Sequence, residues 1–167
     1  ALTANIVGDR AVAIGYNSLQ AQAPVSNTDT YNVAIGLNAM FNTTTGVQNV
    51  AVGGLALDAG TTNTNCVAVG YSSLSANTAD NNVAVGAGAL EVNTSGSSNV
   101  ALGAFALDAN TTASNNTAVG RDALGANTTG VNNVAIGYIA LAGNTSGSTN
   151  VAIGVGALDA NTTQSNN

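Results

Sequence analysis

Short apolar segments recur along this chain at nearly constant intervals, and each has the form Val-Ala-Ile/Val-Gly or a close variant. Within each segment, large apolar residues alternate with alanine, which is the period of a β-strand. The segments end at Gly15, Gly36, Gly53, Gly70, Gly86, Gly103, Gly120, Gly137 and Gly154, in steps of 21, 17, 17, 16 and then four times 17 residues. Asn, Thr, Ser and Gly, which favour turns, fill the intervals. The pattern predicts an all-β fold in tandem repeats.

Other positions of the repeat are equally regular when the units are aligned on this glycine. Four places after it lies a predicted core stack: Leu19, Met40, Leu57, Leu74, Leu90, Leu107, Leu124, Leu141 and Leu158. Eight places after it lies a predicted polar ladder: Thr44, Thr61, Thr78, Thr94, Thr111, Thr128, Thr145 and Thr162. Four places before it lies an asparagine column: Asn32, Asn49, Asn82, Asn99, Asn116, Asn133 and Asn150, and Cys66 takes the asparagine place in its own coil. Stacked asparagines hydrogen-bond along such a column.

A repeat of 17 residues is too short for a helical hairpin, so we interpret it as one coil of a solenoid. The predicted coil has a short strand, a glycine bend, a second short strand at Ala-Leu, and an Asn-Thr-Thr-Gly turn. The fold class is therefore all-β, a parallel β-solenoid (β-roll) of about nine 17-residue coils over residues 11–167. Residues 1–10 match the repeat poorly and are predicted to be a degenerate first coil or a cap. Pro24 and Asn27 fall in a longer loop of the first coil. Coils about 4.8 Å apart give a rod roughly 43 Å long.

The predicted strands are apolar on both faces. In the segment Val33-Ala34-Ile35, the outer two side chains point one way and the alanine points the other. A strand that is apolar on both sides is normally covered on both sides. Since no helical segment is available as a cover, the pattern favours an oligomer, with a single flattened coil as the alternative.

The composition excludes several classes of partner and of chemistry. Only 6% of the residues are charged, the net charge is -6, and Arg10 and Arg121 are the only basic residues. Nucleic acids and anionic membranes need clustered cations, so neither is predicted as a partner. No apolar run approaches the roughly 18 residues of a membrane helix, so no membrane insertion is expected. Cys66 has no disulfide partner in the chain, and we interpret it as a small buried hydrophobe.

The repeat resembles a known family. Segments such as Asn32 to Gly36, Asn150 to Gly154 and Thr117 to Gly120 are similar to the head repeats of trimeric autotransporter adhesins. The stretch from Asn116 to Gly130 also looks like repeats of bacterial surface and phage tail-fibre-like proteins. The resemblance implies a left-handed parallel β-roll, three chains around a common axis, and display at a cell surface or virion. It also implies binding to a surface glycan or matrix ligand without a catalytic pocket.

Catalytic chemistry is not indicated. The chain has no His and no Lys, so no base stands ready to activate a nucleophile. Asp58, Glu91, Asp108 and Asp159 share one column, in which only Glu91 and Asp108 fall on neighbouring coils. Such a pair is compatible with a glycosidase dyad or a weak calcium site, but a solvated acidic edge is the simpler interpretation. We expect no enzyme activity, no metal and no cofactor.

The polar turns support two further hypotheses. Candidate N-glycosylation sequons begin at Asn42, Asn93, Asn110, Asn115, Asn127, Asn144 and Asn161, although asparagine is also a plain turn former. Stacked threonines can order water, as in ice-binding solenoids, but adjacent threonines such as Thr128 and Thr129 would face opposite sides of a strand.

The sequence as a whole predicts a structural or adhesive segment of an extracellular fibre or surface adhesin. The predicted partner is another copy of the chain, in a homotrimer or a filament. The alternatives are a subunit of a self-assembling, glycosylated extracellular filament and an ice-binding β-solenoid.

Overall fold

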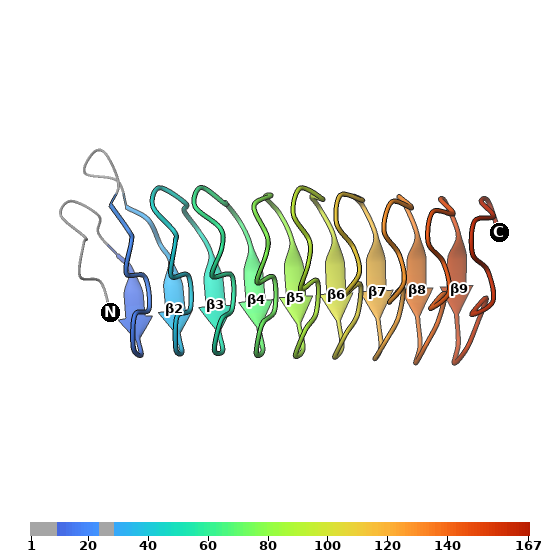
Figure 1. Cartoon of the computed structure of the whole chain (residues 1–167), viewed down its shortest axis with the longest axis horizontal. Coiled ribbons are helices and arrows are strands. Elements are labelled where there is room, and N and C mark those ends of the chain that lie inside the picture. Colours follow the sequence, from blue (N-terminus) through green and yellow to red (C-terminus); the bar gives the residue numbers. More distant parts are fainter. Residues whose placement is uncertain (1–9, 24–28) are drawn as a thin grey trace.

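The computed structural model describes residues 10–23 and 29–167, and the predicted cap over residues 1–10 and the loop residues Pro24 and Asn27 lie almost wholly outside this part. Nine strands of three residues form one parallel sheet in sequence order, as Figure 1 shows. They are β1 (Val12–Ile14), β2 (Val33–Ile35), β3 (Val50–Val52), β4 (Val67–Val69), β5 (Val83–Val85), β6 (Val100–Leu102), β7 (Thr117–Val119), β8 (Val134–Ile136) and β9 (Val151–Ile153). No helix occurs in the described residues, so the predicted parallel β-solenoid is confirmed.

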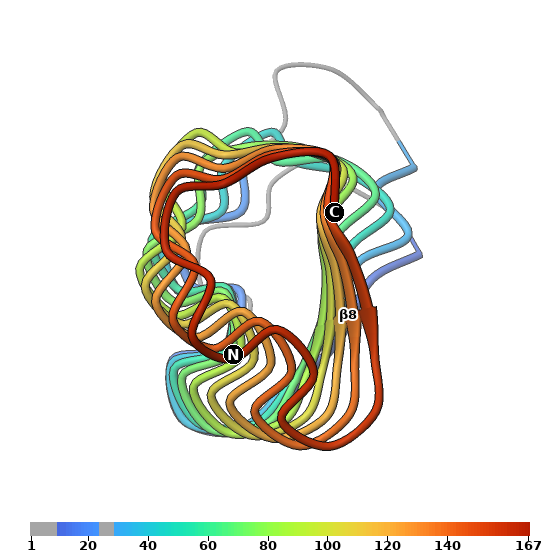
Figure 2. The same ribbon diagram turned by 90° about the vertical axis from the view of Figure 1, so that its right-hand side faces the viewer.

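The coils stack in strict register. Each strand pairs with the next so that equivalent residues are partners, for example Ala84 with Ala101 and Ala101 with Ala118. Backbone bonds continue beyond the strands: the amide of Val33 donates to the oxygen of Asn49 at 2.9 Å. The view along the rod shows the coils superposed, with the strands on one side and the turns on the others (Figure 2). Because each strand packs only on its neighbours, the protein is quasi-one-dimensional.

The predicted second strand at Ala-Leu is wrong, because this segment is a turn in every coil. Leu107 has a φ of 53° and Phe105, two places before it, a φ of 57°, and the equivalent residues of the other coils have positive φ as well. Residues with a left-handed backbone conformation turn the chain toward the interior, and the leucine side chain therefore points into the core. The turn still bonds to the next coil, since the amide of Leu90 donates to the oxygen of Ala106 at 3.0 Å. The ladder between coils therefore continues without strand geometry.

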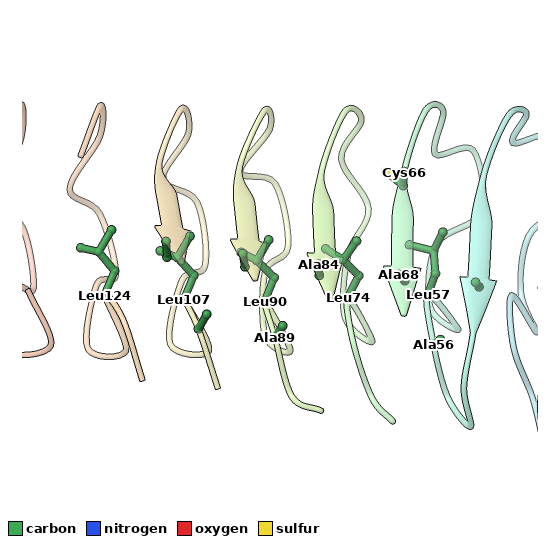
Figure 3. Close-up of a cluster of buried hydrophobic side chains, with 14 of the residues drawn as sticks. Ala56, Leu57, Cys66, Ala68, Leu74, Ala84, Ala89, Leu90, Leu107 and Leu124 are labelled. Carbon is green, nitrogen blue, oxygen red and sulfur yellow. The ribbon is translucent and has the colours of Figure 1, made fainter. Parts of the chain in front are cut away.

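The interior is filled by leucine and alanine. The core-stack residues from Leu19 to Leu141 are fully buried, and only Leu158 on the last coil is exposed, at 40%. The buried members form one cluster with the central alanines of β2 to β9, and Figure 3 shows part of it. The valine and isoleucine side chains of the strands, by contrast, lie on the outside of the sheet. The leucines already fill most of the interior beside the sheet. The space that is left there fits only the methyl group of the central alanine of each strand.

Two asparagine ladders complete the interior. In the predicted column, Oδ1 of Asn116 accepts a hydrogen bond from the backbone amide of Asn133 at 3.0 Å. Nδ2 of Asn116 donates a hydrogen bond to the backbone oxygen of Gly130 at 2.9 Å. A second ladder, not predicted, runs seven places after the glycine, where Nδ2 of Asn127 donates to Oδ1 of Asn110 at 3.2 Å. Buried amides cost free energy unless they are bonded, and these amides are bonded to the coil above or below. The ladders therefore fix the spacing and register of the coils.

Candidate interaction surface

The outward strand face is the side of the sheet that points away from the core. It consists of the first and last residue of each strand: Val12, Ile14, Val33, Ile35, Val50, Val52, Val67, Val69, Val83, Val85, Val100, Leu102, Thr117, Val119, Val134, Ile136, Val151 and Ile153. All these side chains are half-buried or exposed, while the alanine between each pair is buried in eight of the nine strands. The predicted two-faced apolar strand is therefore present, and none of residues 10–23 and 29–167 covers its outer face.

A flanking column widens this surface on one side. The residue after the glycine is large, apolar and exposed in five coils: Tyr16, Leu37, Tyr71, Tyr138 and Val155. In the coil of β7 the same place holds Arg121, whose Nε lies 3.1 Å from Oδ2 of Asp122. The outward strand face itself contains no charged residue. Most of the large hydrophobic residues that are exposed in the described chain belong to this face or to the flanking column.

The threonine ladder lies in a turn and is bonded to the backbone. The Oγ1 of Thr128 donates to the oxygen of Thr145 at 3.0 Å, and Thr145 repeats the bond to Thr162 at 3.1 Å. Thr94 makes the same bond to Thr111 at 3.0 Å. These hydroxyls therefore link successive coils, and each donates its one hydrogen bond to a backbone oxygen of the protein.

The column of candidate glycosylation sites belongs to the second asparagine ladder. Asn93, Asn110, Asn127 and Asn144 are fully buried, and Nδ2 of each donates to a neighbouring coil. A glycan is attached through this nitrogen, so the folded coil has no place for one at these four positions. Asn161 on the last coil is half-buried, whereas Asn42 and Asn115 are exposed. Neither the turn interpretation nor the glycosylation hypothesis anticipated that the four buried asparagines face inward.

The acidic column forms an edge beside the leucine turns. Asp58, Glu91 and Asp108 are half-buried, and Oδ1 of Asp58 accepts a hydrogen bond from Ser75 at 2.9 Å. Partial burial raises the pKa of Asp108, and the nearby carboxylates of Asp122 and Glu91 raise it further. No cluster of three or more metal-ligating side chains occurs among the described residues.

Cys66 is buried in the place of an asparagine. Its Sγ lies 3.3 Å from the oxygen of Ala79, the atom that corresponds to the acceptor of the asparagine amide in other coils. Burial raises the pKa of the thiol. The cysteine therefore acts as a small member of the interior, as predicted, and the thiolate that reacts with electrophiles is disfavoured.

The rest of the described surface offers no enclosed site. Residues 10–23 and 29–167 form no pocket, and none of them belongs to a helix long and apolar enough to cross a membrane. A comparison with protein-family models, with curated proteins and with solved structures found no significant match, so the similarity to adhesin head repeats remains a hypothesis.

Proposed function

We propose that this chain is a structural segment of an extracellular fibre or surface adhesin and associates side by side with copies of itself through the outward strand face. The observation that carries the proposal is the outward face of the sheet, which is uncharged and apolar at all but one position. A parallel sheet is normally covered on both faces, and here the part of the chain that the structure describes covers only one.

The size of the surface supports a second copy as its cover. Nine strands about 4.8 Å apart and about 10 Å long give a face of roughly 400 Å². The exposed flanking residues Tyr16, Leu37, Tyr71, Tyr138 and Val155 widen it. The combined surface approaches the roughly 800 Å² that each partner buries in a typical stable interface.

The distribution of charge also supports self-association. The chain carries a net charge of -6, which makes two copies repel each other where acidic residues meet. The outward strand face carries no charge, so two copies touch there without burying an unpaired carboxylate. The acidic and polar columns then remain on the outside and keep the assembly soluble.

The stiffness of the coil stack fits a spacer or a display segment. Backbone bonds, two asparagine ladders and the threonine ladder join successive coils, so elongation adds identical turns without adding a new fold. Extracellular display, with a surface glycan or matrix component as ligand, is proposed from the resemblance to adhesin head repeats. The same repeated exterior columns would present many equivalent contacts to such a ligand.

The native mass in analytical ultracentrifugation tests the self-association. We expect a multiple of the chain mass of 16.1 kDa, with three chain masses for a homotrimer and very large species for a filament. Val67→Glu places a charge in the middle of the outward strand face and is expected to yield monomers with an unchanged circular dichroism spectrum. Thr112→Glu, on an exposed turn, is the control and should keep the native mass. A wild-type chain that stays monomeric at micromolar concentration would contradict the proposal.

A further inference from the structure

One residue interrupts the outward strand face. Of its eighteen positions, seventeen are Val, Ile or Leu, and the remaining one is Thr117 in β7. Thr117 lies in register between Val100 and Val134, so its hydroxyl is surrounded by aliphatic side chains on its own sheet. Its side chain makes no hydrogen bond to any other described residue. A covering partner would therefore have to supply the bond or leave the hydroxyl unpaired.

The two ways of laying one copy against another treat this hydroxyl differently. If the copies point the same way in register, each strand meets the same strand, and the two Thr117 side chains meet where the symmetry axis runs beside the first residues of the strands. If they point in opposite ways with full overlap, β7 meets β3, and Thr117 meets Val50 and Val52. A displacement by one coil brings Thr117 against the layer of Val100 or Val134. In the first arrangement the hydroxyls can bond to each other, since each is both donor and acceptor.

We propose that Thr117 sets the direction and register of self-association: copies lie side by side, point the same way, and meet β7 against β7. The inference rests on the proposed self-association and adds its geometry. An isolated polar residue in an apolar interface is a known means of fixing register, because every other alignment buries it without a partner. Opposed copies bury two unpaired hydroxyls per pair, which disfavours them by at least about tenfold.

Cross-linking of single cysteines tests the geometry. In a Cys66→Ser background, Val134→Cys puts a thiol on β8, which meets β8 in the proposed arrangement and β2 in the opposed one. Val83→Cys puts it on β5, which meets β5 in both arrangements and serves as the positive control. A short bifunctional maleimide is added to link thiols that face each other. In a mixture of Val33→Cys with a size-tagged Val134→Cys, a cross-link between the two different variants reports the opposed arrangement, in which β8 meets β2. If Cys66→Ser does not fold, the native buried cysteine is retained.

We expect Val134→Cys to cross-link to itself about as efficiently as Val83→Cys, with at least about tenfold less product between Val33→Cys and Val134→Cys. Adding Thr117→Val should bring these two products to comparable yields, whereas Thr117→Ser, which keeps the hydroxyl, should preserve the selectivity. An oligomer in which Val134→Cys fails to cross-link to itself overturns the proposed direction and register. Selectivity that survives Thr117→Val overturns the role of Thr117. A native mass of one chain instead refutes the self-association itself, so the two failures are distinguishable.

Discussion

Replacing Gly53 by alanine is expected to destabilise the solenoid far more than the same change at its neighbour Gly54. A Cβ on Gly53 would lie 2.6 Å from the carbonyl carbon of Gly70 on the next coil and closer still to its oxygen. Gly53 also has a φ of 141°, a region that L-residues avoid. A Cβ on Gly54 would lie 3.5 Å from the ring of Tyr71, which is ordinary contact.

The magnitude follows from the two costs at Gly53. The unfavourable φ costs about 1–3 kcal/mol. Relief of the overlap needs a separation of the coils by roughly 1 Å, because carbon atoms pack at about 3.5 Å. That movement breaks bonds such as the one from the Gly70 amide to the Val52 oxygen at 2.8 Å, each with a net value of about 0.5–1.5 kcal/mol. The sum is roughly 4 kcal/mol, or a Tm lower by about 10 °C for a chain of this length.

Thermal unfolding followed by circular dichroism measures the effect, and hydrogen exchange locates it in the coils of β3 and β4. Gly54→Ala should leave Tm unchanged or raise it slightly, since alanine lowers the entropy of the unfolded chain. Gly154→Ala separates the two costs, because its φ is 129° but no atom lies closer to the new Cβ than 4.0 Å. If Gly53→Ala is as stable as Gly54→Ala, or if Gly154→Ala is equally damaging, close stacking is not what requires glycine.

Four further predictions concern the interior, its acidic edge and the threonine ladder. Leu107→Ala should cost about 2–5 kcal/mol, because the side chain is fully buried, whereas Leu158→Ala, at a site 40% exposed, should cost much less in the same urea unfolding assay. Asp108→Asn should raise Tm at pH 7. Because the pKa of Asp108 is raised in the folded state, the carboxylate destabilises the fold once the pH rises above 3.8, the ordinary pKa of aspartate. Below pH 3.8 the carboxyl is protonated in both states, so the wild type and the variant should have the same Tm. Equal Tm values at pH 7 would contradict this. Cys66 should react with a thiol reagent far more slowly in the native protein than in urea, and equal rates would show that its coil opens readily. Purified protein should show no thermal hysteresis, because the hydroxyls of the threonine ladder already bond to neighbouring coils.

The regular spacing made the solenoid and its core stack predictable. A leucine such as Leu107 that recurs every coil must stack on its equivalents, whatever the shape of the coil. The turn around it was not predictable from local preference, because a leucine with φ near 50° is rare in proteins. Closure of the whole coil, with its backbone bonds to both neighbours, is what stabilises that conformation.

The asparagine of the turn shows the same limit. Asn127 was expected to favour a turn and to be a candidate glycosylation site, and both expectations treat it as a surface residue. The structure buries it, because a side-chain amide placed inside can bond to Asn110 in the same position of the next coil. The constancy of asparagine at this place in six successive coils, from Asn77 to Asn161, was the available signal, since an exposed turn would tolerate several residue types.

The sequence by itself determined the number of coils, their parallel register and the presence of two apolar strand faces, because all three follow from the repeat period and the alternation of side chains. Only the tertiary structure decided which face is inside. The leucines enter from the turn and fill the interior, so the strand can present only a methyl group there, and Ala118 faces inward while Thr117 and Val119 face outward. That choice depends on the closure of the coil, which no local pattern encodes, and it produces the uncovered apolar face.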